Sequence, residues 1–539
     1  MKKIATLLLA AGLVFSAATG ASAIDFKAKG QWIMSFDYGQ NGNFMGKNQG
    51  HTQTGWNGKE DDFEARQRLR LSFDAVASES LSGTFGIEIG KSVWGKGTAG
   101  TALGADRADV IKVRWAYLDW MVPETDLKVR MGIQGVTLPS FTVGGSHVLW
   151  DEVAGITANY QVNDMVGITA MWARPYNDNY GGWEIESQDD YRANYMDNLD
   201  AFALLVPLTF DGVKVTPWGM YAAIGPNTFR DGNSNDPNNW YADKTMGVSR
   251  GQALSGLFPV GGARHKDFTN ANNVASRKLT SYGNAWWGGL TGEVTILDPL
   301  RIAWDFEYGS VTWEDDGRLN RQGWLASLLA EYKLDWATPG IYGWYSSGDD
   351  NNPANGSERM PTISSGNSTS GFSNFAFDGD PYIARDGVIG NSMTGTWGVG
   401  ARLKDMSFIE NLTHTFRVNL MGGTNSKSMA KKMSLAGLWA NGTDIGDGVG
   451  QFQMGGINSA SFGIGHEAMY LTTGDTALEF GLSNYYKMYE NFTIALEADY
   501  IALWLDTSKS AWGARHKYGE GIPQTKDAWN INASFVYSF

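Results

Sequence analysis

Apolar and polar residues alternate along this chain with a period of two, in repeated segments of about ten residues. The last segment shows the pattern most clearly. One face carries Trp529, Ile531, Ala533, Phe535, Tyr537 and Phe539, and the other carries Asn530, Asn532, Ser534 and Ser538. Because successive side chains of a strand point to opposite faces, the segment predicts a strand with one apolar and one polar side.

The same alternation recurs at 26–37, 300–309 and 492–500, where charged residues such as Arg301 occupy the polar side. A soluble β-sandwich also alternates, so the period alone favours a membrane barrel only modestly. Charged residues spread over many polar faces, together with aromatic strand ends, favour a barrel with an apolar outside and a wet inside.

Counting the alternating segments gives an even number of strands, about eighteen, with sixteen as the alternative because segments such as 340–346 are weak. A barrel of this size is too wide for its side chains to fill, so an aqueous channel remains. The predicted strands are 24–38, 63–76, 81–90, 109–121, 126–135, 153–161, 165–174, 199–210, 213–224, 286–297, 300–310, 323–334, 340–346, 394–404, 412–422, 475–487, 492–504 and 528–539.

The connections between these segments alternate between tight turns and long loops. Short turn-forming sequences occur at 162–164, 211–212, 298–299 and 490–491, whereas 225–285, 346–393 and 423–474 are long and rich in Gly, Asn and Ser. Short periplasmic turns and long extracellular loops are typical of outer-membrane barrels. The predicted fold class is therefore all-β, a transmembrane antiparallel barrel.

The first residues predict a signal peptide. Lys2 and Lys3 precede an apolar run from Ile4 to Ala18, and Ala21-Ser22-Ala23 is a small-residue cleavage site. We expect residues 1–23 to direct export through the Sec pathway and to be cleaved after Ala23, which leaves 24–539 as a single barrel domain. No later run of about 18 apolar residues predicts a membrane-spanning helix.

Composition argues against several other functions. The chain has no cysteine and a formal net charge of -14, which excludes thiolate metal sites and disfavours nucleic acid as a partner. The six histidines lack metal-site spacing, and Asp349-Asp350-Asn351-Asn352 lacks the fixed spacing of a calcium loop. Gly247 to Gly251 matches a nucleophile elbow, but no apolar strand precedes it. We therefore expect that the protein is not an enzyme and that it binds neither a metal ion nor a cofactor.

With the signal peptide, the aromatic C-terminal strand and the long loops, the whole chain resembles the general diffusion porins of Gram-negative outer membranes. Residues 23–32, AIDFKAKGQW, and 345–350, YSSGDD, are most similar to the homotrimeric porins of sulfate-reducing bacteria. The resemblance implies a homotrimer in outer-membrane lipid. It also implies that Phe535, Tyr537 and Phe539 form the signal read by the barrel assembly machinery.

In such porins the loop after the fifth strand folds into the barrel and narrows it. Here that loop, 135–152, carries Pro139, Phe141, Gly144 and Gly145, similar to the family's Pro-Glu-Phe-Gly-Gly motif. Ser140 replaces the acidic residue, and two residues separate Phe141 from the glycines, so the acidic half of the usual constriction is in doubt. The alternative is a plain surface loop.

Basic residues gather on the polar side of neighbouring strands near the N-terminus. Arg66, Arg68 and Arg70 repeat at i, i+2 and i+4 and therefore point the same way. Two interpretations stay open: a basic wall that attracts anions, or an ion-pair network with Glu64, Asp74 and Glu88 that stiffens the barrel. The predicted basic wall is Arg66, Arg68, Arg70, Lys112, Arg114, Lys128 and Arg130, and the predicted opposing acidic group is Glu293, Asp305, Glu307 and Glu331.

The sequence thus predicts an outer-membrane porin for passive diffusion of small hydrophilic solutes and ions, with a mild preference for anions. The alternatives are a barrel with a structural or adhesin role and a barrel hydrolase. A hydrolase would need a clustered Ser/His/Asp set, which the sequence does not display.

Overall fold

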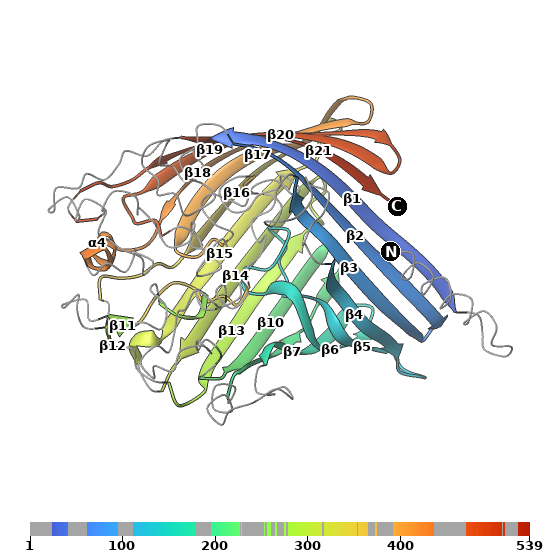
Figure 1. Cartoon of the computed structure of the whole chain (residues 1–539), viewed down its shortest axis with the longest axis horizontal. Coiled ribbons are helices and arrows are strands. Elements are labelled where there is room, and N and C mark those ends of the chain that lie inside the picture. Colours follow the sequence, from blue (N-terminus) through green and yellow to red (C-terminus); the bar gives the residue numbers. More distant parts are fainter. Residues whose placement is uncertain are drawn as a thin grey trace, which may run out of the picture.

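The computed structural model describes residues 24–40, 62–94, 111–177, 196–226, 228, 253, 256–259, 265–266, 274–275, 279–314, 317–352, 354–364, 372–374, 392–435, 470–508, 510–511 and 527–539. Antiparallel strands form one sheet that closes on itself as a barrel (Figure 1). The strands are β1 (Asp25–Gln40), β2 (Asp62–Ser78), β3 (Leu81–Val93), β4 (Ile111–Met121), β5 (Leu127–Thr137), β6 (Trp150–Asn163), β7 (Val166–Asn177), β8 (Asn198–Leu205), β9 (Leu208–Phe210), β10 (Val213–Ile224), β13 (Gly283–Val294), β14 (Leu300–Thr312), β15 (Arg321–Tyr332), β16 (Thr338–Ser346), β17 (Thr396–Ile409), β18 (Leu412–Gly423), β19 (Thr476–Tyr489), β20 (Phe492–Trp504) and β21 (Ala528–Ser538).

The first and last strands close the sheet. β1 pairs with β2 on one side and with β21 on the other, in a register that places Gln31 opposite Ser538. Gly30 and Phe539 exchange two backbone hydrogen bonds, of 2.8 and 2.9 Å, at the end of this seam. A Cβ at Gly30 would stand 2.4 Å from the Phe539 ring, so glycine lets this ring lie directly against the β1 backbone.

The predicted strands are confirmed, because each one overlaps a strand of the barrel. β8 and β9 together correspond to one predicted strand, 199–210, which is interrupted in the structure at Val206 and Pro207. Proline has no N–H to donate to the ladder, which accounts for the interruption. Since β8 and β9 both pair with β10 and act as one strand, the barrel has 18 strands, not the alternative of sixteen.

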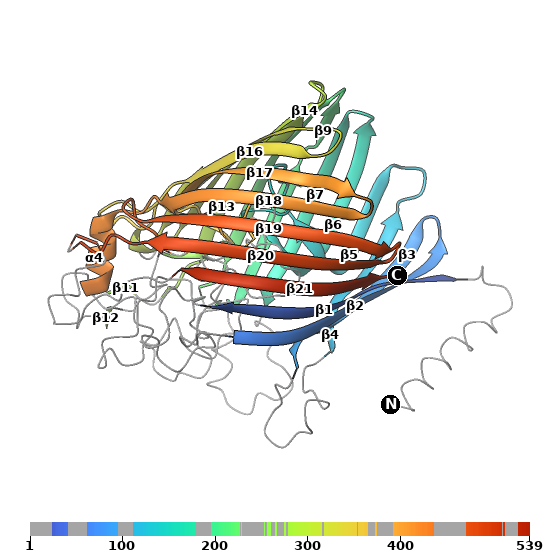
Figure 2. The same cartoon turned by 90° about the horizontal axis from the view of Figure 1, so that it is seen from above.

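The short connections lie together at one end of the barrel, and the described parts of the long connections belong to the other end (Figure 2). The short connections are 79–80, 122–126, 164–165, 211–212, 295–299, 333–337, 410–411 and 490–491. Three small elements belong to the long loops: the hairpin of β11 (His265–Lys266) and β12 (Val274–Ala275), the 3-10 turn η1 (Gly317–Leu319), and the helix α4 (Lys427–Leu435). None of the helices in the described ranges is long and apolar enough to cross a membrane.

The outer face of the barrel is apolar between two belts of exposed aromatic side chains. Between the belts lie exposed aliphatic residues, among them Leu118, Leu290 and Leu328. The belt at the short-turn end comprises Phe26, Trp120, Tyr160, Phe210, Tyr332, Trp336, Phe408, Tyr486, Tyr489, Tyr537 and Phe539, and the belt at the long-loop end comprises Tyr38, Phe63, Trp94, Trp286, Tyr308, Trp324, Tyr345, Tyr500 and Trp504. Aromatic belts around an apolar band match the surface of a barrel that sits in a bilayer.

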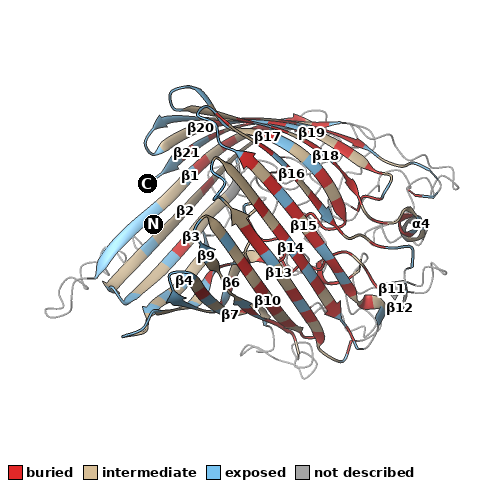
Figure 3. Cartoon of the chain, turned by 180° about the vertical axis from the view of Figure 1, so that it is seen from behind, coloured by how far each residue is buried: buried red, intermediate tan, exposed pale blue. Residues whose placement is uncertain are grey.

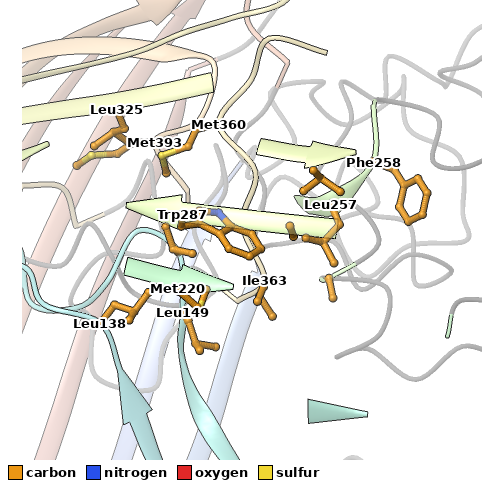
Figure 4. Packing of buried hydrophobic residues seen from close by; sticks show 14 of the residues in the cluster. Leu138, Leu149, Met220, Leu257, Phe258, Trp287, Leu325, Met360, Ile363 and Met393 are labelled. Atoms are coloured by element: carbon orange, nitrogen blue, oxygen red, sulfur yellow. The ribbon is translucent and has the colours of Figure 1, made fainter. Parts of the chain in front are cut away.

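The inner face divides into two regions. Figure 3 shows many buried residues along β10 and β13 to β16, whereas β2 and β3 are mostly of intermediate exposure. The burial comes from loop segments folded against the inner face, where a hydrophobic cluster joins Leu138 and Leu149 to Trp287, Met360 and Ile363 (Figure 4). Loop segments therefore fill much of the barrel interior on the side of β10 and β13 to β16.

Candidate permeation pathway

The predicted basic wall begins on β2. Arg66, Arg68 and Arg70 lie opposite Ser35, Ile33 and Gln31 of β1, and their alternation with exposed outer residues places them on the inner face. Each of the three makes a different contact. Arg66 pairs with Glu64 on its own strand, Arg70 donates from Nε to Glu88 Oε2 at 2.6 Å, and Arg68 donates to Gln31 Oε1 at 3.5 Å.

Arg68 differs from its neighbours because its printed hydrogen bond is to an amide. It is 9% exposed, and its Nε has no hydrogen-bond partner among the described residues. Arg70 and Arg114 lie close enough to repel it electrostatically, while Glu88 attracts it. Within the part of the chain that the structure describes, Arg68 is therefore a cation of this wall without a carboxylate bound to it.

Lys128 and Arg130 continue the wall on β5, where both contact one carboxylate. Asp119 of β4 accepts two hydrogen bonds from Arg130, at 2.6 and 2.8 Å, and its Oδ2 lies 3.0 Å from Lys128 Nζ. The Arg130 guanidinium also lies 4.0 Å from the Tyr117 ring centroid. This cation–π contact orients the guanidinium along the wall.

Between these strands, a β-bulge interrupts the pairing of β3 and β4 at Arg114. Ile87 pairs with Val113 and Gly86 with Trp115, so Arg114 is an extra residue that no β3 residue faces. The bulge shifts the alternation of the residues that follow Arg114, so Tyr117 and Asp119 of β4 face the lumen instead of Ala116 and Leu118. Arg114 contacts Glu152, and its Nε lies 3.9 Å from Glu88 Oε2, while Lys112 lies opposite Glu88.

Both interpretations of the basic residues thus find support in the contacts. Most of the wall is ion-paired, but its cations outnumber the carboxylates that they contact. The side chains of these pairs are between 13% and 42% exposed, which indicates that water reaches them. We refer to this inner surface of β2 to β5 as the hydrated wall.

The predicted acidic group lies on the opposite side of the barrel, on β13 to β15, and most of it is covered. Glu293 binds Lys214 and Arg301, and Glu331 binds Arg301 and Arg402. Asp305, Glu307 and Glu331 are at most 5% exposed. We refer to this covered inner surface of β13 to β15 as the packed wall.

Asp305 is covered by loop 138–149, the part of the predicted constriction loop 135–152 that lies between β5 and β6, and we call it the inner loop. The backbone N–H groups of Phe141 and Thr142 donate to Asp305 at 2.8 and 3.1 Å, the Ser140 hydroxyl donates at 2.7 Å, and the Thr142 hydroxyl adds a further bond. Arg301 donates to the Phe141 carbonyl at 2.9 Å. The loop that leaves β5 therefore reaches inward to β14.

The predicted motif residues take different parts in this loop. Pro139 is half-buried, and Phe141 packs against the hydrophobic cluster. Gly144 is exposed, whereas a Cβ at Gly145 would stand 2.0 Å from the Trp150 ring. Gly145 therefore permits the loop to turn back onto β6. Ser140, which replaces the acidic residue of the family motif, supplies one of the donors to Asp305.

A second segment, 354–364, lies beside the inner loop. Ile363 and Ser364 donate to the Val148 carbonyl, each at 3.0 Å, and Trp150 donates to the Ser364 carbonyl at 2.8 Å. Arg321 of β15, which is 0% exposed, fixes this segment by donating to the carbonyls of Arg359 and Met360, and it also donates to Phe258. Two segments far apart in sequence thus form one body inside the barrel.

Sequence reasoning missed Arg321 and the role of Asp305. Arg321 starts a strand and occupies an inward position, which was visible in the alternation, but its partners are backbone carbonyls that no pattern reveals. His147, one of the six histidines without metal-site spacing, is 1% exposed, with Nε2 located 3.8 Å from Asp305 Oδ2. His414 lies on the outer face of β18 and contacts Asn484.

The residues of the predicted assembly signal lie on the outer face of β21. Phe535, Tyr537 and Phe539 are 36%, 40% and 49% exposed, and the rings of Tyr537 and Phe539 lie 5.3 Å apart. Tyr537 and Phe539 belong to the aromatic belt at the short-turn end, and Phe535 lies next to them on the same face.

Among the described residues, no three His, Cys, Asp or Glu side chains are arranged to hold a metal ion. In the Asp- and Asn-rich tract, Asp349 accepts hydrogen bonds from Ser357 and Tyr470, so it joins loops to one another. The predicted signal peptide and Gly247 to Gly251 lie outside the described residues.

No protein-family model matches the chain, and no curated protein matches it. Among solved structures, it is similar to OpdQ of Pseudomonas aeruginosa, with 10% sequence identity, coverage of 96% of this chain and 98% of that chain, and a TM-score of 0.46. The outer membrane protein OprD from Pseudomonas aeruginosa is 11% identical, with coverage of 95% and 94% and a TM-score of 0.45. A loop-deletion mutant of OmpT, an outer membrane protein of Vibrio cholerae, is 11% identical, with coverage of 96% and 100% and a TM-score of 0.37.

Proposed function

We propose that this protein is a porin of the Gram-negative outer membrane, which forms a water-filled channel for passive diffusion of small hydrophilic solutes and ions. The observation that carries the proposal is the contrast between the two faces of the closed barrel. Outside, an apolar band lies between two aromatic belts; inside, half-exposed charged side chains line the hydrated wall. An apolar outside suits lipid, and a charged inside suits water.

The path of the solute follows from the distribution of burial. The inner loop and segment 354–364 fill the side of the packed wall, so the remaining water runs along the hydrated wall. The inner loop is then the constriction, bounded on the far side by β2 to β5. Passive diffusion through such a passage needs neither a cofactor nor an energy source.

We further propose a mild preference for anions. The basic residues of the hydrated wall outnumber their carboxylate partners, and Arg68 is bound to an amide. On the opposite side, Asp305 and Glu307 are covered and Glu293 and Glu331 are ion-paired, so they oppose this field weakly. Local charges at a narrow passage outweigh the acidic net charge of the chain, because distant exposed charges are screened beyond a Debye length of about 8 Å.

The assembly of the protein completes the proposal. Export through the Sec pathway removes residues 1–23, the barrel assembly machinery reads Phe535, Tyr537 and Phe539, and the mature chain forms a homotrimer. This homotrimer would be like the porins of sulfate-reducing bacteria that residues 23–32 and 345–350 resemble. Light scattering of the protein in detergent tests the trimer, and a monomeric mass would contradict it.

Conductance across a planar lipid bilayer tests the function. The wild-type barrel should give stable current steps, and correctly folded protein without current would leave a structural or adhesin barrel instead. In a salt gradient, replacing Arg66, Arg68 and Arg70 together by glutamine should shift the zero-current potential toward cation preference, with a smaller shift at high salt.

A matched control is Lys333→Gln, which removes a positive charge from an exposed short connection at the barrel end. This control should leave the zero-current potential nearly unchanged. An unchanged potential in the triple arginine variant at low salt would show that these arginines do not line the passage.

A further inference from the structure

His147 lies at the point where the inner loop meets the packed wall. Its side chain is 1% exposed, its Nε2 lies 3.8 Å from Asp305 Oδ2, and neither ring nitrogen has a hydrogen-bond partner among the described residues. A buried imidazole without hydrogen bonds is unfavourable unless another interaction compensates it. The nearby carboxylates provide that interaction.

Glu307 is the second carboxylate at this point. It follows Asp305 by two residues on the inner face of β14, is 0% exposed, and has no hydrogen-bond partner for either carboxylate oxygen among the described residues. The charged groups that act on Glu307 are His147 and Asp305, and those that act on His147 are Glu307 and Asp305. These three side chains therefore form one electrostatic cluster.

The remaining polar groups around this cluster do not supply a second cation. Arg301, on the same face of β14, is bound to Glu293, Glu331 and the Phe141 carbonyl. Ser140, Thr142 and Ser327 surround Asp305 with uncharged donors. Compensation of the two carboxylates consequently falls to the imidazole of His147.

We propose that His147 is a positioning residue, whose imidazolium form holds the inner loop on β14 as the counter-charge of Asp305 and Glu307. Burial disfavours the charged ring, whereas two adjacent carboxylates favour it. When the ring loses its proton, two buried carboxylates remain next to each other without a cation, which is costly in a site of low dielectric constant. The inner loop then detaches from β14 at alkaline pH.

This detachment would widen the passage, a consequence that rests on the proposed porin function. We call the contact of His147 with Asp305 and Glu307 the latch. The latch does not depend on the porin function, so it can be tested separately. The chain has no cysteine, and an introduced thiol is therefore its sole reactive sulfur. Val148 is a suitable probe position because its side chain is 0% exposed inside the hydrophobic cluster.

The experiment measures the reaction of Val148→Cys with a membrane-impermeant maleimide between pH 6 and pH 9. Ser80→Cys, in the exposed turn between β2 and β3, corrects for the pH dependence of the thiol itself. Relative to this control, the rate at Val148→Cys should rise at least about tenfold at the alkaline end, the change that about one pH unit of imidazole titration corresponds to. A constant ratio over the whole range would overturn the proposal.

Three further substitutions, each added to Val148→Cys, separate a positioning role from mere packing. His147→Gln cannot be protonated and should give the fast alkaline rate at every pH. Glu307→Gln removes one carboxylate that favours the imidazolium, so the transition should move to lower pH. His414→Gln, on the outer face, should retain the parental profile. If Glu307→Gln left the midpoint unchanged, electrostatic coupling between these residues would be refuted.

Single-channel recording distinguishes failure of the latch from failure of the proposed function. Current that grows and becomes noisier at alkaline pH, in step with thiol exposure, supports both the latch and the porin function. Thiol exposure that follows pH in a barrel without current supports the latch and refutes the porin. Normal current with pH-independent protection of Val148→Cys refutes the latch alone.

Discussion

The hydrated wall and the packed wall are built from the same kind of strand, yet their arginines are in opposite situations. Arg70 on β2 is 36% exposed and pairs with one carboxylate. Arg321 on β15 is 0% exposed and donates to three backbone carbonyls of folded-in segments. Alternation places both residues on the inner face, but what covers that face is decided by loops from distant parts of the chain.

This difference separates two roles for charge inside a barrel. On the hydrated wall, water screens each ion pair, so a pair contributes little to stability and much to the local electric field. On the packed wall, desolvated groups must be fully bonded, so their charge serves to fix structure. Comparing matched residues on the two walls tests this division.

The largest difference should come from removing one arginine from each wall. Arg321→Met leaves the carbonyls of Phe258, Arg359 and Met360 without their donor and should destabilise segment 354–364 by about 3 kcal/mol. Hydrogen exchange at Ile363 should then accelerate by roughly two orders of magnitude. Arg70→Met, which breaks a half-exposed pair, should change that exchange rate by less than about fivefold, equivalent to about 1 kcal/mol. Equal effects of the two substitutions on exchange at Ile363 would contradict the division of roles between the two walls.

Neutralising one aspartate on each wall should have a smaller effect than removing one arginine, and the two aspartates should affect different properties. Asp305→Asn replaces acceptors of several donors by an amide and should loosen the inner loop by about 2 kcal/mol, measured as faster exchange at Phe141 and Thr142. Asp119→Asn should leave that exchange unchanged. Instead it should increase anion preference in the salt-gradient measurement, because Lys128 and Arg130 lose their shared carboxylate. A selectivity change in Asp305→Asn alone would reverse the assignment of the walls.

The smallest effect on stability should occur at the long-loop end of the barrel, where Lys427 of α4 lies 2.7 Å from Asp506. Burial raises the pKa of Asp506, but the hydrogen bonds from Lys427 and Ser508, together with the positive charge of Lys427, outweigh it, so the pKa is below its usual value. The pair should therefore stabilise the protein above the ordinary carboxyl range, and the stabilisation should vanish as the pH falls through the lowered pKa.

The test compares the melting temperatures of the wild type and Asp506→Asn. At pH 7 the variant should be less stable by at most about 1 kcal/mol, since the pair is partly exposed. Near pH 2 the two should melt together. A difference that persists in acid would show that the Asp506 carboxylate acts through something other than its charge.

The strands and their faces could be predicted because they depend on a local period. Each strand of the barrel carries its own alternation, so the inward direction of Arg66, Arg68 and Arg70 was visible in the sequence. The bulge at Arg114 was not, because one inserted residue depends on the pairing with β3 and leaves no mark in composition.

The contacts of the packed wall could not be predicted for a different reason. Asp305 meets Phe141 across 164 positions of sequence, and Arg321 meets Phe258 through a backbone carbonyl that every residue possesses. The family motif indicated an inner loop, but Asp305, the residue that anchors it, appeared in the sequence only as one of several inward carboxylates.

The seam between β1 and β21 has a kinetic consequence. Its paired residues, such as Gln31 and Ser538, are separated by nearly the whole chain, whereas every other strand pairs with a neighbour in sequence. Loop-closure entropy makes so distant a pairing the slowest to nucleate, so we expect the seam to form last. Until then the growing sheet has two open edges of unpaired N–H and C=O groups. The lifetime of that open sheet, set by how quickly Phe539 finds Gly30, determines how long the chain is vulnerable to aggregation.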